Sequence, residues 1–293
     1  MKVLFSVPGS KVYINRFYRN HPKSFINISI TGKRCSLLCK HCRAILLKSM
    51  ADASKDSLLD IVERNHSAGL RGILVSGGFN RSGRLELQDR HYADIREIKK
   101  RYPRLKVLIH CGFTDKENAK KMSWSGIDGV LLNIIGSRRA IESIYRLKGF
   151  RPSDYYGSFK ILKDTGLKIA PHIVTGLESP RLKHEYGAVD RLLAMGADNM
   201  VFVTNKRLRK DLTEPGFDRE EFLALIRYTA RSDRSLKIAF GCAQPCGREK
   251  EKTEIELLRL KIGSMAFPSE KAIEFAIKHG IDYEFRQECC ALI

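Results

Sequence analysis

Three cysteines near the N-terminus have a spacing suited to holding an iron-sulfur cluster. Cys35, Cys39 and Cys42 occur in the segment CSLLCKHC, shortly after an apolar run. Soft thiolates hold iron-sulfur clusters, and three of them leave one iron of a 4Fe-4S cube without a protein ligand. Such an open iron can bind a substrate or cosubstrate, as the open position of a catalytic metal site does. The alternative is a zinc site with His41 or a later side chain as the fourth ligand.

A second group of cysteines lies near the C-terminus. Of the eight cysteines in the chain, Cys242, Cys246, Cys289 and Cys290 fall there, whereas Cys111 stands alone and is interpreted as a small buried hydrophobic residue. Clustered cysteines in a chain with no secretory signal indicate metal binding or catalysis in a reducing compartment. Four thiolates can bind a second cluster, and the alternatives are a structural zinc ion or a redox pair.

Charge and composition narrow the class of protein. Lys and Arg number 53 against 33 Asp and Glu, which gives a formal net charge of +20. Such a field favours an anionic partner, whether RNA, an acidic protein or a carboxylate substrate. With 43% hydrophobic and 29% charged residues, the chain is an ordinary globular protein and not a disordered or disulfide-scaffold one. No run approaches the roughly 20 apolar residues of a membrane span, so we expect a cytoplasmic location.

The elements that must position these cysteines alternate regularly. Five glycines, each after a helical pattern, precede an apolar run: Gly69, Gly126, Gly166, Gly196 and Gly280. Together with four further apolar runs they predict eight strands before the final helix, at 25–31, 72–76, 106–111, 129–133, 168–174, 199–204, 236–241 and 262–267, and the run at Tyr283 follows that helix. Alternating βα units predict an α/β fold, a (β/α)8 TIM-type barrel over residues 25–293 with a Cys-rich C-terminal tail. Residues 1–24 are predicted as a short N-terminal arm. The alternative architecture is an open or six-stranded version of the barrel with a C-terminal extension.

On a parallel barrel the working groups lie at the carboxyl ends of the strands. We therefore expect one mouth to be surrounded by the cysteine loop and by Ser76, Gly77, Gly78, His110, Cys111, Asn133, His172, Thr175, Gly176, Glu178, the segment from Lys206 to Lys210, and Cys242. Closure of the barrel would bring Cys289 and Cys290 near its first and last elements.

The spacing CxxxCxxC, with a His or aromatic residue before the last Cys, resembles the signature of the radical SAM superfamily. Here the matching residues are Cys35, Cys39, His41 and Cys42. The resemblance implies a barrel with a 4Fe-4S cluster on the three cysteines, whose open iron chelates S-adenosylmethionine (SAM). It also implies reductive cleavage of SAM to a 5′-deoxyadenosyl radical, which abstracts hydrogen from an unactivated carbon.

Further SAM contacts follow from the resemblance. Ser76-Gly77-Gly78 resembles the family's GGE loop, whose carbonyl groups accept hydrogen bonds from the SAM amino group, although Phe79 stands where the family has Glu. The segment HIVTGLE at 172–178 resembles a motif that lies beside the adenine and ribose. The implied SAM-binding residues are His41, Ser76, Gly77, Gly78, Asn133, His172, Thr175, Gly176 and Glu178. The alternative for each is local: a glycine turn or a helix cap.

The order of motifs over residues 25–293 resembles the biotin synthase branch, especially the archaeal two-protein lipoyl synthases. The segments SGG, HCG, LNIIG, PHIVTGLE, GCAQP and ECCAL carry this likeness. Only Cys111 matches a second-cluster position of biotin synthase, which disfavours biotin formation. The resemblance implies sulfur insertion into an octanoyl C–H bond, with an auxiliary cluster on Cys242, Cys246, Cys289 and Cys290. The implied partners are an acidic octanoyl or lipoyl carrier protein, a second radical SAM subunit and an electron donor such as ferredoxin.

Two other functions remain open from the sequence. One is radical SAM modification of RNA, which the net charge would serve, although no RNA-binding module is recognised. The other is a non-catalytic, cluster-binding partner subunit. The segment TNKRLRKDLTEP has four cations among five residues, from Lys206 to Lys210, which would suit an anionic substrate or an acidic docking partner.

Overall fold

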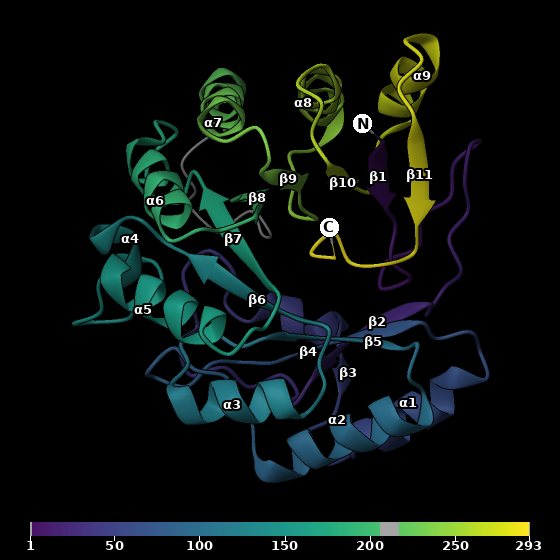
Figure 1. Ribbon diagram of the computed structural model, residues 1–293, viewed down its shortest axis with the longest axis vertical. Helices are drawn as coiled ribbons and strands as arrows, with labels where there is room; N and C mark the ends of the chain where they lie inside the picture. Colours follow the sequence, from purple (N-terminus) through teal and green to yellow (C-terminus); the bar gives the residue numbers. More distant parts are fainter. Residues whose placement is uncertain (1, 206–216, 293) are drawn as a thin grey trace.

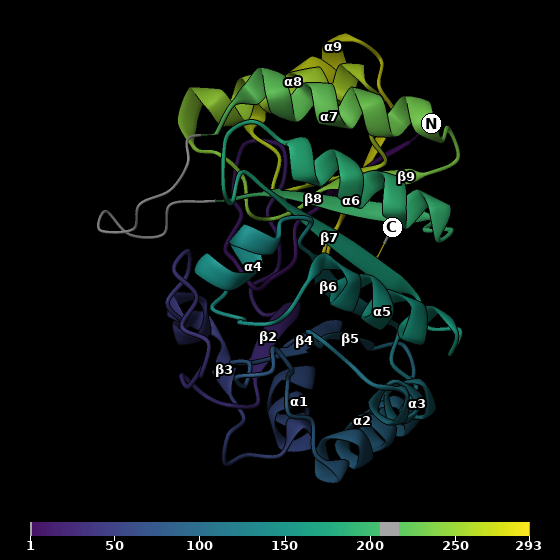
Figure 2. The same ribbon diagram turned by 90° about the vertical axis from the view of Figure 1, so that its left-hand side faces the viewer.

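A computed structural model describes residues 2–205 and 217–292, so the predicted cationic segment from Lys206 to Lys210 lies outside the described residues. The described chain forms one curled sheet whose strand pairs are all parallel, with the helices on its outer, convex face (Figures 1 and 2). Among these residues no helix is both long and apolar enough to cross a membrane.

The described strands number eleven and follow one another around the curl. They are β1 (Val3–Ser6), β2 (Phe25–Ser29), β3 (Ala51–Asp52), β4 (Gly72–Ser76), β5 (Lys106–His110), β6 (Gly129–Ile134), β7 (Ile169–Thr175), β8 (Asn199–Thr204), β9 (Lys237–Phe240), β10 (Ser264–Ala266) and β11 (Tyr283–Arg286). The order is β11-β1-β10-β9-β8-β7-β6-β5-β4-β2-β3, so the sheet is a half-barrel with β11 and β3 at its two edges.

Helices cover the outer face of this sheet. They are α1 (Leu58–His66), α2 (Asp89–Arg101), α3 (Lys116–Trp124), α4 (Arg138–Ser143), α5 (Pro152–Lys163), α6 (Lys183–Ala194), α7 (Arg219–Ser232), α8 (Gly247–Arg259) and α9 (Glu270–Lys278), with a 3-10 helix at Ile45–Ser49. Local chemistry fixes their starts: Ser57 accepts backbone N–H bonds at the start of α1, and Ser269 does so for α9. Each helix buries an apolar face against the sheet, as Leu58, Ile61 and Val62 do in α1.

The predicted rhythm of strands and helices is confirmed. All eight predicted runs are strands, within a few residues at their ends. The five predicted helix-ending glycines all have a positive φ, between 62° at Gly280 and 87° at Gly69. The predicted α/β fold is therefore confirmed, in the form of a half-barrel that carries a Cys-rich tail.

The N-terminal arm both joins the sheet and spans its open side. Its residues Val3–Ser6 form β1, which lies between β10 and β11. Beyond β1, the ring of Tyr18 stacks on Phe285 of β11 at a centroid distance of 4.2 Å, and the backbone N–H of His21 donates to the Gln287 side chain at 2.7 Å. Ser24 then meets the start of β4, because its carbonyl oxygen accepts from the Arg71 backbone.

The concave face of β5 to β9 is built in three layers, because alternate residues of a strand point to the same side. Nearest the amino ends, the amino-end layer contains Lys106, Lys168, Asn199 and Lys237. Two residues further along, the middle layer is apolar and contains Leu108, Leu131, Ala170, Val201 and Ala239. Two residues further again, the polar layer contains His110, Asn133 and His172. Figure 1 shows the tail leaving β11 and ending within this concave side.

Candidate metal centre

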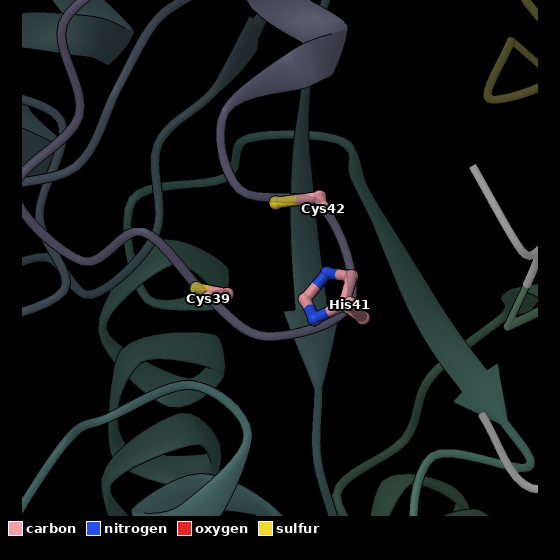
Figure 3. Close-up of side chains that lie close together, drawn as sticks. All are labelled: Cys39, His41 and Cys42. Carbon is pink, nitrogen blue, oxygen red and sulfur yellow. The ribbon is translucent and has the colours of Figure 1, made fainter. Parts of the chain in front are cut away.

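The three N-terminal cysteines lie in the loop that leaves the carboxyl end of β2. Leu38, Arg43 and Ala44 have φ values of 42°, 43° and 59°, so the backbone coils tightly through the motif. As a result, potential ligand atoms of Cys39, His41 and Cys42 all lie within 4.8 Å of one another. Figure 3 shows the three side chains on this loop. No other group of three or more such His, Cys, Asp or Glu atoms occurs within the described part of the chain. Cys35 does not belong to this tight group.

Cys35 is held in place by the loop after β4. A Cβ atom added to Gly78 would collide with the carbonyl oxygen of Arg34 and would lie 2.5 Å from the Cα atom of Cys35. The Ser36 N–H donates to the Phe79 carbonyl oxygen at 2.9 Å, and the Cys35 thiol lies 3.8 Å from the same oxygen. The loop after β4 therefore forms a cradle for Cys35 that a residue larger than glycine at position 78 would fill.

The surroundings shift the pKa values of the Cys39 and Cys42 thiols in opposite directions. Cys42 accepts a hydrogen bond from the Cys39 thiol and also interacts with His41, and these contacts lower the pKa of Cys42. The same bond, together with burial, raises the pKa of Cys39 above its usual range. Cys39 is buried, and its thiol lies 3.7 Å from the carbonyl oxygen of Tyr145. The pair thus shares a proton, and a metal that replaces this proton would meet both sulfur atoms at once.

His41 contributes an unsatisfied atom to the same place. Its Nδ1 atom is buried and has no hydrogen-bond partner, while its ring lies 4.9 Å from the ring of Tyr145. A buried polar atom without a partner costs free energy, so this nitrogen is suited to a ligand at the cysteine loop. Three thiols and a cradle that excludes a Cβ atom fit an iron-sulfur cluster, whereas Cys39, Cys42 and His41 together also fit zinc.

The predicted SAM-binding residues lie on adjacent strands. Ser76, at the end of β4, is buried, and the Gly78 N–H donates to the Thr31 hydroxyl at 2.7 Å. Asn133 of β6 and His172 of β7 are paired in register. His172 is further fixed by a 2.8 Å hydrogen bond between its Nδ1 atom and the carbonyl oxygen of Ala170.

His110 completes this polar layer on the inner face of the half-barrel. Burial lowers the pKa values of His110 and His172 to about 4, and each imidazole is therefore neutral near pH 7. Asn133 hydrogen-bonds to His110, which opposes part of that shift, and Phe79 meets the ring of His110 edge-on at 5.5 Å. Because Phe79 also accepts from the cysteine loop, a continuous path of contacts joins that loop to the polar layer.

Leu177 and Glu178 line a different space, whereas Thr175 and Gly176 do not belong to its wall. A cavity of about 260 Å³ lies between the ends of β6 and β7 and is lined by Ser137 and Glu178, among others. Glu178 accepts a hydrogen bond from the Ser137 hydroxyl and faces Arg139 at 3.7 Å. The Gly176 N–H donates to the Glu185 carboxylate at 3.2 Å, and the Thr175 hydroxyl donates to the carbonyl oxygen of Val203 at 3.1 Å.

The C-terminal cysteines converge on the concave face. Cys290 is buried against the middle layer, and Cys289 packs against the same layer at Leu108 and Leu131. Cys242 follows β9 and contacts solvent, but the surrounding protein and the Cys289 thiol raise its pKa to about 11. Cys246 is exposed and immediately precedes α8. Cys289 and Cys290 share a thiol hydrogen bond as Cys39 and Cys42 do, but within the described part of the chain no three of the C-terminal cysteines form a group like the one at the loop.

Sequence reasoning missed several residues that hold the site. Thr31 accepts from the Gly78 N–H and donates to the Arg34 carbonyl oxygen at 2.9 Å, so it links the two loops. Tyr145 covers Cys39 and His41 from a segment more than a hundred residues away. The position of Thr31 directly before the motif was a usable signal, whereas Tyr145 had none. Ser137 was also missed, although serine before a helix is a typical cap.

No protein-family model matches the sequence, and no curated protein matches it. Solved structures do match the fold. The [FeFe]-hydrogenase maturase HydG from Carboxydothermus hydrogenoformans is 13% identical with a TM-score of 0.61, and the match covers 99% of this chain and 68% of HydG. A second HydG structure is covered over 65% of its length.

Two further similar structures come from different enzymes. Methylornithine synthase (PylB) is 12% identical with a TM-score of 0.59, over 95% of this chain and 85% of PylB. SuiB from Streptococcus suis, solved with bound S-adenosylmethionine, is 15% identical with a TM-score of 0.56, over 83% of this chain and 57% of SuiB. These structural neighbours are radical SAM enzymes, and at such low identity they establish a shared fold.

Proposed function

We propose that this chain is a radical SAM enzyme whose 4Fe-4S cluster is held by Cys35, Cys39 and Cys42. One observation carries the proposal: three cysteines with the superfamily's spacing occupy a tightly coiled loop at the carboxyl end of β2, in a fold shared with radical SAM enzymes. When bound, the reduced cluster and SAM would supply a carbon-centred radical able to abstract hydrogen from an unactivated C–H bond. The remaining roles belong to the side chains of this chain.

Each group of residues has a defined task in this proposal. Gly78 admits the backbone of Cys35, and carbonyl groups of the loop after β4 would accept from the SAM amino group. Glu178, already oriented by Ser137, bounds the cavity that would receive the nucleoside part of SAM. The polar layer of His110, Asn133 and His172 faces the concave side, where neutral imidazoles can donate or accept hydrogen bonds without adding charge.

For the substrate, we propose lipoyl synthase-like sulfur insertion into an octanoyl chain carried by an acidic protein. The support is that Cys289 and Cys290 lie against the middle layer of the concave face, and that Cys242 at the carboxyl end of β9 interacts with Cys289, so these thiols could hold a second cluster inside the half-barrel. A net charge of +20 would steer an acidic carrier toward the chain, and this attraction should weaken in salt. A second radical SAM subunit and a ferredoxin-type electron donor complete the proposal.

The test is anaerobic reconstitution followed by metal analysis and turnover. The protein should take up iron and sulfide, and reduction with SAM present should release 5′-deoxyadenosine, which chromatography detects. Mass spectrometry of an octanoyl-carrier, with and without a candidate second subunit, should then show the mass gain of one or two sulfur atoms. Zinc at the loop, or iron without SAM cleavage, would leave the chain as a non-catalytic partner subunit.

RNA modification is the second candidate, and the net charge of +20 is the observation that favours it. The discriminating measurement is binding of tRNA and of the lipoyl carrier at two salt concentrations. Salt-sensitive binding to tRNA, without binding to the carrier, would favour RNA modification over sulfur insertion as the function. The radical SAM assignment would remain.

A further inference from the structure

The amino end of the half-barrel contains a cavity that the proposed chemistry does not use. It has a volume of about 460 Å³, and its walls include the amino-end layer of β5 to β9. This end is opposite to the cysteine loop, because the loop follows the carboxyl end of β2. The C-terminal tail forms part of the wall through Glu288, Ala291 and Leu292. The residues between them, Cys289 and Cys290, therefore lie beside the cavity.

The cavity wall contains four cations and three carboxylates, and two of the cations have no ion-pair partner among the described residues; the carboxylates are Asp128, Asp198 and Glu288. Lys106, Lys168 and Lys237 point to the concave side from the amino ends of three strands, and Arg286 joins them from the end of β11. Lys106 is paired with Asp128 at 3.1 Å, and Arg286 with Glu284 at 3.1 Å. By contrast, Lys168 and Lys237 are exposed, and across residues 2–205 and 217–292 neither has an ion-pair partner.

A second feature of the wall also indicates a ligand. The amide nitrogen of Asn199 donates to the carbonyl oxygen of Ile169 at 2.8 Å and to Asp198 at 2.7 Å. Its Oδ1 atom is buried and has no partner. This oxygen is closed to a water-sized molecule in the present arrangement, so an anion that carries a proton would donate to it only after the Asn199 side chain turns toward the cavity.

The middle layer connects the cavity to the tail thiols. Leu108 and Leu131 line the cavity and also contact Cys289, while Ala170 lines it and contacts the cluster that contains Cys290. From these contacts we infer that the amino end of the half-barrel is an entrance through which small anions reach the tail thiols. The chemical class that fits is a small sulfur anion, such as hydrosulfide. Only that choice of sulfur rests on the proposed sulfur insertion, in which the tail must be resupplied.

A reporter thiol in the cavity wall tests the entrance directly. Ala291→Cys places a thiol there that is not a proposed cluster ligand, so the full chain can be used with its clusters in place. The chain is treated with two methanethiosulfonate reagents of similar size, one bearing a sulfonate and one a trimethylammonium group. Tandem mass spectrometry of the peptide that follows Arg286 gives the rate at the reporter for each reagent.

We expect the anionic reagent to react at least about tenfold faster than the cationic one at low salt, and less so at high salt. Adding Lys168→Glu and Lys237→Glu should reverse this preference, and the milder Lys168→Gln with Lys237→Gln should abolish it. The matched control, Lys100→Glu with Lys278→Glu, makes the same change in net charge at exposed helix positions and should leave the preference intact.

Three results would overturn the inference: equal rates for the two reagents, a preference that survives replacement of both wall lysines, or a reporter that neither reagent reaches. Because the readout is a modification rate and not turnover, a chain that fails to cleave SAM still tests the entrance. Conversely, an active enzyme whose reporter shows no charge preference would support the proposed function and contradict the inferred entrance.

Discussion

The two cysteine groups of this chain are built in different ways. Cys39 and Cys42 are three residues apart, and the coiled loop brings their sulfur atoms together with a nitrogen of His41 inside 4.8 Å. Cys242 and Cys289 come from segments almost fifty residues apart and meet on the concave face of the sheet. The first group is therefore assembled by local backbone geometry, whereas the second depends on how the tail crosses the half-barrel.

This difference predicts different behaviour. A loop whose ligands are preassembled loses little conformational freedom when it binds a metal or cluster. Thiols that converge only through tertiary packing can change their spacing when the tail moves, which suits a site that exchanges its contents. Variants that alter one cysteine group and leave the other intact test this difference.

The largest effect is expected at the loop. Cys39→Ala removes a buried ligand in the centre of the motif, so SAM cleavage should fall by at least about a thousandfold and about four iron atoms per chain should be lost. Cys111→Ala is the matched control, because Cys111 is also buried but lies outside both groups. The measurements are the amount of 5′-deoxyadenosine released and the iron content of both variants. An active Cys39→Ala chain would contradict the cluster assignment.

The cradle beneath Cys35 offers a test without removing any sulfur. In Gly78→Ala, the new methyl group would press on backbone atoms of Arg34 and Cys35, which cannot yield as a flexible side chain can. We expect the free energy of unfolding to drop by about 2–4 kcal/mol and iron uptake to decrease. Gly157→Ala is the control, since its Cβ atom meets nothing within 4 Å in the middle of α5, and it should be neutral or slightly stabilising. Urea unfolding measures the stability of both variants. Equal stabilities would contradict the close packing of position 78 against the backbone of Cys35.

The sequence predicted most of the fold and the first site, because both follow from local patterns. Alternating strands and helices, and the turn glycines such as Gly69, depend on neighbours within a few residues. The Cys39 and Cys42 thiols belong to the same class, since the short coiled segment between them sets their spacing, whereas Cys35 is positioned by the distant loop after β4. Tyr145 could not be predicted, because its contact with Cys39 exists only after α4 and the following turn pack over the loop.

The tail shows where sequence reasoning stops. Closure of the barrel was expected to bring Cys289 and Cys290 near the first and last elements, and β11 does pair with β1. Beyond Arg286, however, the tail crosses to the inner face of β5 to β9, where Cys290 is buried against Ala170 and Val201. No pattern in ECCAL specifies that path, because it is decided by the apolar middle layer that the other strands provide.

Iron content tests whether the tail group is a second cluster. If it is, the reconstituted chain should carry about eight iron atoms, and Cys289→Ala should carry about four and still release 5′-deoxyadenosine. Cys111→Ala should again keep the full content. About four iron atoms in both the unmodified chain and Cys289→Ala would assign the tail to zinc or to a redox pair and confine iron to the loop.

The smallest effect is expected from the polar layer, which lies between the cysteine loop and the middle layer that contacts Cys289 and Cys290. Burial lowers the pKa values of His110 and His172 to about 4, below the roughly 6.5 of an unfolded histidine. The unfolded chain therefore binds protons first as the pH falls. The contribution of the two neutral imidazoles to the free energy of unfolding is complete above about pH 6.5, and it is lost as the pH falls toward 4.

Between pH 7.5 and pH 5 these two residues should account for about 1–3 kcal/mol of lost unfolding free energy, a value discounted because both rings are partly exposed. The double variant His110→Gln with His172→Gln lacks both imidazoles, so its stability should fall less over this range than that of the unmodified chain. Carboxylates elsewhere titrate equally in both proteins and cancel in the difference. Anaerobic urea titrations at the two pH values supply the numbers, and parallel losses in both proteins would mean that the imidazoles titrate normally and face open solvent. In that case the two cysteine groups would be separated by water and not by a protected polar layer.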